Sequence, residues 1–312
     1  MTNLIPRREV EEIVACHALE ATLVDVFVEG YSDECILRWY CVQRGLKNVQ
    51  VYGIETVDIS SSMALFGNRQ RVIELAATLG GRVTPGKVSC VCDLDFEQWV
   101  PSAKISLGTL VFTDFACMEG YFIEQSLLEK FLIMVVGAGD LAPTFLQDLG
   151  PLIMECFLIR LAHAVLGWDL CWISPERCCE VKNGLPSLDR SEFIKRLLQK
   201  NGHIKDLECL ERKIGELRPT LGSDPRHSIH GHDFMDLLAW FLKKRASVSH
   251  SSDVLYRMLM GCVREEGLVP FSLFSTLEDR AKQFARCPSG VTATHSGLMP
   301  QPKRSSPGRV DT

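Results

Sequence analysis

The sequence predicts an α/β protein in which a parallel sheet flanked by helices is followed by an α-helical region. Three observations predict this. Short β-branched runs alternate with amphipathic segments over the first 135 residues, two of these runs end abruptly in carboxylates, and from about residue 142 the pattern is helical. Such alternation is typical of βαβ units, whose crossover helices cover both faces of a parallel sheet.

The elements of the first region follow from its apolar pattern. Strands are expected at 23–29, 49–53, 88–92 and 109–113, and helices at 33–44, 68–79 and 118–133. The helix at 68–79 has the clearest ends, because Asn68 is a candidate N-cap and two glycines follow Leu79.

The second region reads as helices separated by loops rich in Gly, Pro and Ser. Helices are expected at 151–167, 191–200, 205–217, 233–245, 252–265 and 275–286. We therefore divide the chain into an N-terminal segment (1–20), an α/β domain (21–135), an α-helical domain (136–286) and a tail (287–312). The composition of the tail predicts disorder.

Composition and charge limit the class of protein. The chain has 312 residues and a formal net charge of -5, which argues against a broad basic surface, so a nucleic acid would have to be held locally. The start of the chain shows no secretory signal, and the longest apolar stretch, Pro151 to Trp168, contains charged residues. We expect a soluble cytoplasmic protein with no membrane segment.

Thirteen cysteines are spread along the chain, mostly within apolar runs, as at Cys90, Cys92, Cys156 and Cys171. Their spacing matches no zinc site, and their number is odd. The pattern indicates reduced thiols in the core of a cytosolic protein.

Carboxylates follow two of the predicted strands. Glu29 ends the first strand and Asp33 lies one helical turn later, while Asp93 and Asp95 follow the third strand and would face one side if that strand continued. The carboxyl ends of parallel strands meet at one edge of a sheet, and a Mg²⁺ or Mn²⁺ ion is the usual reason for acids to gather there. Taken singly, Ser32 or Asp33 could equally be the N-cap of the next helix.

At this point the sequence resembles a known family. A hydrophobic strand ending in Glu-Gly-x-x-Asp at Glu29–Asp33, followed by a strand ending in Asp-x-Asp at Asp93–Asp95, resembles the toprim signature of topoisomerases, primases and overcoming-lysogenization-defect nucleases. The segments at 112–119 and 231–244 are similar to the toprim-containing DUF4435 group. That group includes the nuclease subunit of PARIS anti-phage systems.

The resemblance implies a toprim fold and assigns roles to single residues. Glu29 would be the catalytic acid/base or a metal-bound carboxylate, and Asp93 and Asp95 would bind metal. The supporting carboxylates would be Asp33, also a metal ligand, with Asp114 and Glu119. One departure is Cys117, which stands where the family usually has an aspartate before its Ile-Glu pair.

The segment at 231–244, which contains His232 and Asp233, adds two further candidates. His232 could transfer a proton near the phosphodiester, and Asp233 could support it or simply begin the helix that follows. Lys243, Lys244 and Arg245 form a basic run at the end of that helix, where they complement its dipole.

The implied function is that of a Mg²⁺-dependent nuclease serving as a toxic anti-phage effector. It would be held inactive by an ABC-type ATPase subunit, released on infection to cleave host tRNA, and could act as a homodimer. One alternative is a DNA-specific nuclease of the overcoming-lysogenization-defect type. Another, of a different class, is a degenerate toprim domain that binds the ATPase as a sensor or scaffold.

Overall fold

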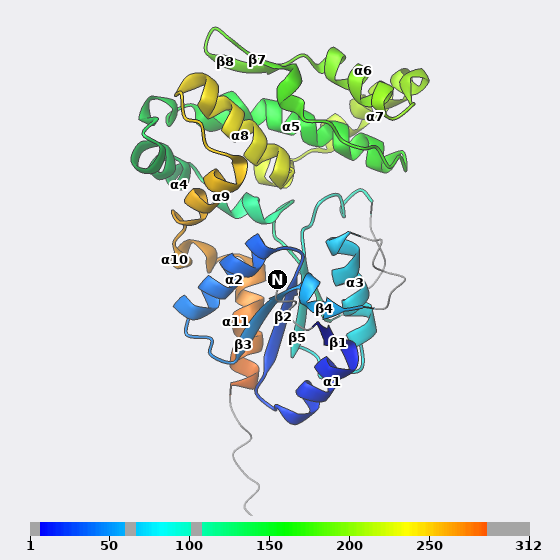
Figure 1. Cartoon of the computed structure of the whole chain (residues 1–312), viewed down its shortest axis with the longest axis vertical. Coiled ribbons are helices and arrows are strands. Elements are labelled where there is room, and N and C mark those ends of the chain that lie inside the picture. The colour runs from blue at the N-terminus through cyan, green and yellow to red at the C-terminus, as the bar shows by residue number, and fades with distance from the viewer. Residues whose placement is uncertain (1–6, 60–66, 101–107, 286–312) are drawn as a thin grey trace, which may run out of the picture.

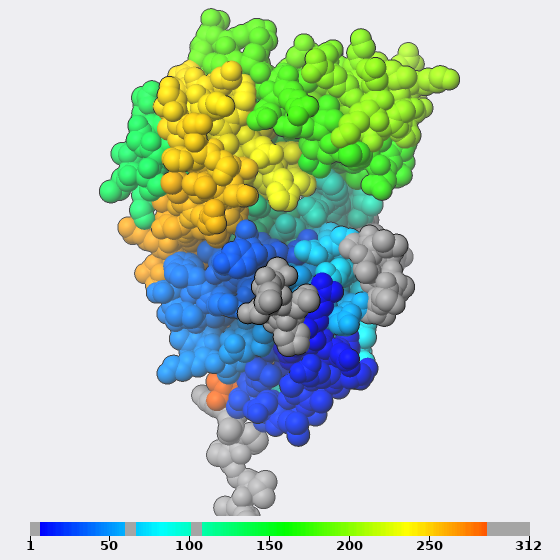
Figure 2. Space-filling view, in the orientation of Figure 1, coloured from blue at the N-terminus to red at the C-terminus, as the bar shows by residue number. Residues whose placement is uncertain are grey.

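The computed structural model describes residues 7–59, 67–100 and 108–285, which form an α/β lobe and a helical lobe (Figure 1). In the space-filling view the helical lobe sits directly on the α/β lobe (Figure 2). One core cluster joins them, since it contains Val26 and Val28 of the sheet together with Phe234 and Leu237 of the helical lobe. The tail expected from residue 287 lies outside the described residues.

A four-stranded parallel sheet forms the centre of the α/β lobe. Its order is β3-β2-β5-β6, and the strands are β2 (Val24–Val28), β3 (Val49–Gly53), β5 (Val88–Cys92) and β6 (Leu110–Phe112). Every residue of β2 and β5 is buried, as expected for central strands covered on both faces. The prediction of a parallel sheet flanked by helices is confirmed. A small parallel pair, β1 (Arg8–Glu9) with β4 (Val57–Asp58), lies beside it.

Helices cover the two faces of the sheet with alternating strand residues beneath them. On one face, α1 (Val10–Leu19) and α3 (Asn68–Leu79) pack over Phe27 and Cys90. On the other, α2 (Tyr31–Gln43) and α11 (Ser272–Phe284) pack over the cluster that contains Val26. The alternation follows from the two-residue period of a strand.

Helix α11 comes from the region that the sequence analysis assigns to the helical domain, yet it packs against the sheet (Figure 1). Glu278 accepts hydrogen bonds from the Tyr40 hydroxyl and from Arg44 Nε, both at 2.7 Å. Arg280 donates to Ser89 Oγ at 2.6 Å. The end of the described chain thus returns to the first lobe and joins the two regions.

The helical lobe contains most of the expected helices. They are α4 (Gln125–Lys130), α5 (Phe145–Val165), α6 (Arg190–Lys200), α7 (Leu207–Leu217), α8 (Gly231–Arg245), α9 (Ser252–Met260) and α10 (Glu265–Leu268). Helix α5 begins six residues before Pro151, which lies inside it. The expected helix at 118–133 is instead three pieces: the 3₁₀ helix η3 (Met118–Phe122), α4 and a π-helix (Phe131–Val136).

A segment between the expected helices, where only a loop was expected, forms a short antiparallel hairpin of β7 (Cys179–Lys182) and β8 (Leu185–Leu188). Asn183 and Gly184 form its turn with φ of 51° and 84°. Asn-Gly favours such two-residue hairpin turns because both residues tolerate positive φ. The sequence therefore contained this signal.

The long apolar helix α5 is anchored inside the protein by its charged residues. Glu155 pairs with Arg190 and Arg218, and Arg160 pairs with Asp233. In the described ranges, no helix combines the length and the apolar character that a bilayer crossing needs. Cys90, Cys92 and Cys156 are buried thiols, as expected, whereas Cys171 is exposed.

Candidate functional site

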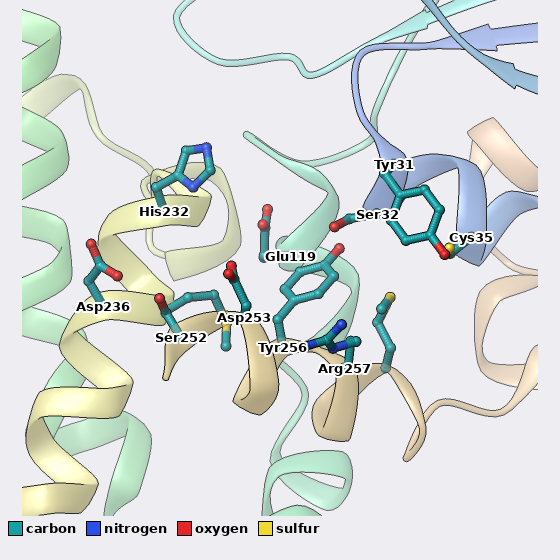
Figure 3. Close-up of a pocket in the computed structure, with 12 residues that line it drawn as sticks. Tyr31, Ser32, Cys35, Glu119, His232, Asp236, Ser252, Asp253, Tyr256 and Arg257 are labelled. Carbon is teal, nitrogen blue, oxygen red and sulfur yellow. The ribbon is translucent and has the colours of Figure 1, made fainter. Parts of the chain in front are cut away.

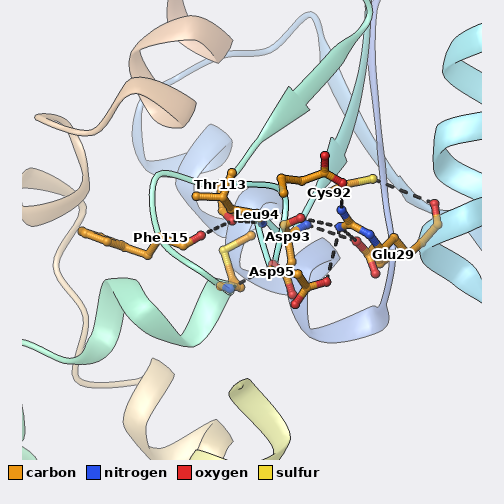
Figure 4. A network of polar contacts seen from close by, with 10 residues as sticks. Glu29, Cys92, Asp93, Leu94, Asp95, Thr113 and Phe115 are labelled. Carbon is orange, nitrogen blue, oxygen red and sulfur yellow. Dashed lines mark hydrogen bonds and ion pairs between the residues drawn. The ribbon is translucent and has the colours of Figure 1, made fainter. Parts of the chain in front are cut away.

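The carboxylates that follow β2 and β5 meet because these strands are neighbours. Val28 pairs with Val91, so both strands end at the same edge of the sheet. The backbone N–H of Asp93 donates to Glu29 Oε1 at 3.1 Å (Figure 4). The sheet thus brings together two acids that are 64 residues apart in sequence.

The loop that carries Asp93 and Asp95 is fixed by backbone hydrogen bonds and is not a continued strand. Strand β5 ends at Cys92. The N–H of Leu94 donates to Thr113 Oγ1 at 2.9 Å, and the N–H of Asp95 donates to the Ala116 carbonyl at 2.7 Å. Asp95 has a φ of 44°, a left-handed conformation that is uncommon outside glycine. The expectation of a continuing strand is therefore wrong, because these amides bond to the 113–116 loop.

Arg69, in the first turn of α3, lies among the outer carboxylates and was not among the predicted site residues. It donates to Glu97 Oε1 at 2.6 Å and to the Asp93 carbonyl. Its guanidinium is 3.4 Å from Asp95 Oδ2 and 3.6 Å from Glu29 Oε1. The last two distances are those of ion pairs and exceed ordinary hydrogen-bond lengths. Glu29, Asp95 and Glu97 thus form an outer group around one cation.

Asp33, Asp93 and Glu119 form an inner group without such a cation. Burial, followed by the charges of Glu119 and Glu29, raises the pKa of Asp33 to about 8. Burial and then Asp33 and Glu119 raise the pKa of Asp93 well above its ordinary value, and burial raises that of Glu119. None of the three forms an ion pair with a described Lys or Arg. Their proximity therefore carries uncompensated repulsion.

Two local features place the inner group. Helix α2 has Gly30 as its N-cap, without a side-chain capping bond, so Ser32 and Asp33 lie inside its first turn. Asp93 Oδ1 accepts a hydrogen bond from the Met118 N–H at 3.0 Å, which ties the β5 loop to η3. The neighbouring residue, Glu119, is thereby held beside Asp93.

The Glu119 carboxylate fits against the start of α8. A Cβ atom added at Gly231 would lie 2.1 Å from Glu119 Oε2, so a side chain cannot be placed there without displacing the carboxylate. The amino end of a helix also favours a negative charge. His232 is the next residue. Burial leaves the pKa of Glu119 raised, but His232 acts in the opposite direction, which places this predicted catalytic residue beside the inner group.

Glu29 belongs to the outer group but also acts on the inner one, since its charge raises the pKa values of Asp33 and Asp93. Burial raises its pKa, the nearby charge of Arg69 lowers it, and Asp95 raises it again, with a net value of about 6. A carboxyl with such a pKa can both accept and release a proton near neutral pH.

Asp114 is not where the sequence analysis expected it. Its Oδ1 accepts from the Ser272 N–H at 2.7 Å, and its Oδ2 accepts from the Leu273 N–H at 3.0 Å and the Tyr121 hydroxyl at 2.7 Å. Burial alone would raise its pKa, but these hydrogen bonds lower it. Asp114 thus caps α11 and does not support the inner group.

Asp233 likewise has a structural place. Arg160 of α5 binds it through two hydrogen bonds of 2.6 and 2.9 Å, and Trp172 Nε1 donates to it at 3.0 Å. The Arg160 guanidinium stacks over the Trp172 ring at 3.9 Å. Asp233 therefore anchors α8 to α5, and its oxygens point toward these groups.

A cavity of about 370 Å³ opens beside Glu119 and His232 (Figure 3). Its walls come from α2, α8 and α9: Tyr31, Ser32, Cys35, Met235, Asp236, Ser252, Asp253, Tyr256, Arg257 and Met260. Of the inner group, Glu119 lines this pocket, whereas Asp33 and Asp93 lie behind its wall.

The donor set of the inner group fits a hard divalent cation. Carboxylate oxygens are the ligands that Mg²⁺ and Mn²⁺ prefer. Burial and then neighbouring acids raise the pKa values of Asp33 and Asp93, and a bound cation would offset both effects. In the described part of the chain, no set of three or more His, Cys, Asp or Glu side chains already stands in metal-ligand geometry.

Comparison with models of protein families found no match, and comparison with curated protein sequences found none either.

Proposed function

We propose that this chain is a Mg²⁺-dependent nuclease of the toprim type. One observation carries the proposal. Three carboxylates from distant parts of the chain, Asp33, Asp93 and Glu119, gather at one rim of the sheet without an ion pair to a described Lys or Arg. Burial raises the pKa of all three, and the charge of Glu119 raises those of Asp33 and Asp93 further. Such an arrangement destabilises the fold, and perturbed carboxylates in a cleft are typical of functional sites.

The chemistry follows from the two groups of carboxylates. Asp33, Asp93 and Glu119 would hold Mg²⁺ or Mn²⁺, which supplies Lewis-acid stabilisation of a phosphodiester when bound. Glu29, with a pKa of about 6, accepts the proton of the attacking water as the bond to phosphorus forms. The phosphorus bond to the leaving oxygen breaks, and His232 gives that oxygen a proton.

Asp95 has a different role in this proposal from the metal ligand expected at first. It lies 3.4 Å from the Arg69 guanidinium and shares it with Glu97. The proposal assigns Asp95 to holding Arg69 at the edge of the site, where a guanidinium can face a phosphate oxygen.

The biological setting that the resemblance implies is part of the proposal. The chain would be a toxic anti-phage effector that cleaves host tRNA after release from an ABC-type ATPase subunit, with a homodimer as its active form. Metal-phosphate chemistry is common to RNA and DNA, so the alternative of a DNA-specific nuclease is tested with the same protein.

The test uses the purified full chain with Mg²⁺ or Mn²⁺ and two substrates, total tRNA and duplex DNA. Asp93→Asn should abolish cleavage and cellular toxicity. Asp279→Asn is the matched control, because Asp279 is an exposed carboxylate on α11. Equal cleavage and toxicity in the Asp93 variant and the wild type would end the proposal, and the preferred substrate decides between RNA and DNA.

Arg69 favours a second candidate, a non-catalytic module that binds the ATPase. A guanidinium 3.6 Å from Glu29 and 3.4 Å from Asp95 already supplies positive charge to part of the cluster. This candidate predicts that the chain recovers the ATPase in a pull-down and shows no metal-dependent cleavage even when separated from it. Metal-dependent cleavage by the free chain would exclude it.

A further inference from the structure

The pocket beside Glu119 contains a buried hydroxyl that the proposed chemistry does not use. Tyr256 of α9 is only 6% exposed, and its hydroxyl has no hydrogen-bond partner among the described residues. Figure 3 shows this hydroxyl directed into the pocket, between Glu119 and Ser32. Because buried hydroxyls normally find a partner, an unpartnered one at this wall points to a ligand that accepts its hydrogen bond.

The wall of the pocket suits a planar ring. Tyr31, at the start of α2, is 70% exposed although it is aromatic, and Arg257 of α9 is exposed beside the same cavity. Met235 and Met260 add apolar surface. Aromatic rings and guanidinium planes are the groups on which unpaired nucleobases stack, and about 370 Å³ lies in the usual range for small-ligand pockets.

A groove continues from the pocket along α8. This second hollow, of about 630 Å³, shares Asp236 and Ser252 with the pocket and is lined by Arg177, Lys243 and Lys244. The three cations are exposed, and none of them forms an ion pair with a described carboxylate, although Glu176 and Asp236 also line the groove.

Helical geometry explains why pocket and groove are continuous. Asp236, Trp240, Lys243 and Lys244 recur at the three- and four-residue spacing that places side chains on one face of a helix. From His232 to Lys243 the helix rises by roughly 16 Å, which is long enough to follow several linked phosphates. The face of α8 thus leads from the acidic site to a basic surface.

We infer that this pocket and groove bind a single strand of nucleic acid, with one unpaired nucleotide in the pocket and the continuing backbone along Lys243 and Lys244. The base lies against Tyr31 and accepts the hydrogen bond of Tyr256. A paired base within a duplex cannot enter such a pocket without leaving its stack. This inference rests on the proposed function and narrows its substrate to loops and single-stranded ends.

The test measures binding and not cleavage. A short fluorescein-labelled single strand is titrated with the full-length protein in Ca²⁺, which takes the same oxygen ligands as Mg²⁺. Tyr256→Phe removes only the hydroxyl and should weaken binding about 10-fold. Tyr52→Phe, on β3 and outside the pocket lining, is the matched control and should bind like the wild type.

The groove is tested by salt dependence. The double variant Lys243→Gln/Lys244→Gln should reduce the slope of log affinity against log salt by about 1.4, because each phosphate contact to a single strand contributes about 0.7. An unchanged slope together with unchanged affinity of Tyr256→Phe would overturn the inference. Equal or tighter binding of a duplex of the same sequence would overturn the assignment to single strands.

The outcomes separate this inference from the proposed function. Binding that depends on Tyr256 and the two lysines, without cleavage under any metal, supports the strand site and removes the nuclease proposal. Metal-dependent cleavage together with binding that does not depend on Tyr256 or the two lysines supports the nuclease proposal and removes the strand site.

Discussion

Two carboxylates of the α/β lobe, Glu278 and Asp33, lie in opposite surroundings and have opposite pKa shifts. Burial alone would raise the pKa of Glu278, but hydrogen bonds from Lys282, Arg44 and Tyr40 outweigh it and hold the pKa at about 2. Burial and neighbouring acids raise the pKa of Asp33 to about 8. The first carboxylate joins α11 to α2 and stabilises the fold, whereas the second opposes it. Under the proposed function, this difference separates a structural acid from one that would bind metal.

The largest expected effect is that of replacing Asp33, the carboxylate with the raised pKa. Asp33→Asn should lower metal-dependent cleavage by about 100-fold or more, because even groups that only support metal ligands are worth 10- to 100-fold. Without metal the same variant should be more stable than the wild type at pH 8, by roughly 1 to 3 kcal/mol. Activity assays and urea unfolding measure the two effects.

The sign of the stability change depends on pH. A carboxyl whose pKa is raised from an ordinary value of 3.8 to about 8 on folding favours the folded state fully below the ordinary value and loses this contribution as pH rises through about 8. The gain from Asp33→Asn should therefore be larger at pH 8 than at pH 4. A variant that is less stable than the wild type at pH 8 would show that Asp33 is a structural acid like Glu278.

Glu278→Gln should have the opposite pair of effects. We expect a loss of about 2 to 3 kcal/mol in the free energy of unfolding at neutral pH, with cleavage retained at temperatures where the variant is folded. Because the pKa of Glu278 is lowered from 4.5 to about 2, its contribution is present above pH 4.5 and disappears as pH falls to about 2. The difference between wild type and variant in urea unfolding should shrink over that window.

Gly231→Ala changes the position of one inner carboxylate without removing it. Because a Cβ would lie 2.1 Å from Glu119 Oε2, the carboxylate must move, and we expect Mn²⁺ affinity to fall about 10-fold. Calorimetric titration with Mn²⁺ measures this. Gly215→Ala in α7 is the matched control, since a Cβ there meets no atom within 4 Å. Equal Mn²⁺ affinity in both variants would remove Glu119 from the metal site.

The comparison also shows how much the sequence could predict. The strands that lead directly to Glu29 and Asp93 carry local patterns, and parallel topology alone brings their ends together. Asp114 follows a strand in the same way, but its partners are the amide groups of α11, more than 150 residues away. In the sequence, Asp93 and Asp114 look the same, because each is an acid that follows a strand. Only tertiary packing distinguishes a proposed metal ligand such as Asp93 from a helix cap such as Asp114.

Other parts of the site had no local signal at all. Arg69 lies in an ordinary amphipathic helix. It pairs with Asp95 only because the first turn of α3 packs beside the loop that follows β5. Tyr256 reads as a core residue of α9, and its hydroxyl becomes informative only when the surrounding partners are known. The Asn183-Gly184 hairpin, by contrast, was predictable from residues alone.

The smallest expected effect concerns Arg69. This cation pairs with the carboxylates of the outer group, so they resemble Glu278, which also has cationic partners, more than Asp33, which has none among the described Lys and Arg residues. Its charge lowers the pKa of Glu29, so Arg69→Gln should raise that pKa above about 6. If Glu29 accepts the proton of the attacking water, activity must rise with pH as Glu29 ionises, and the midpoint of that rise should move upward by up to about one unit. A pH-rate profile of both proteins measures the shift. An unchanged midpoint would mean that another group accepts the proton, and that Glu29, like Glu278, is held by its partners for structure.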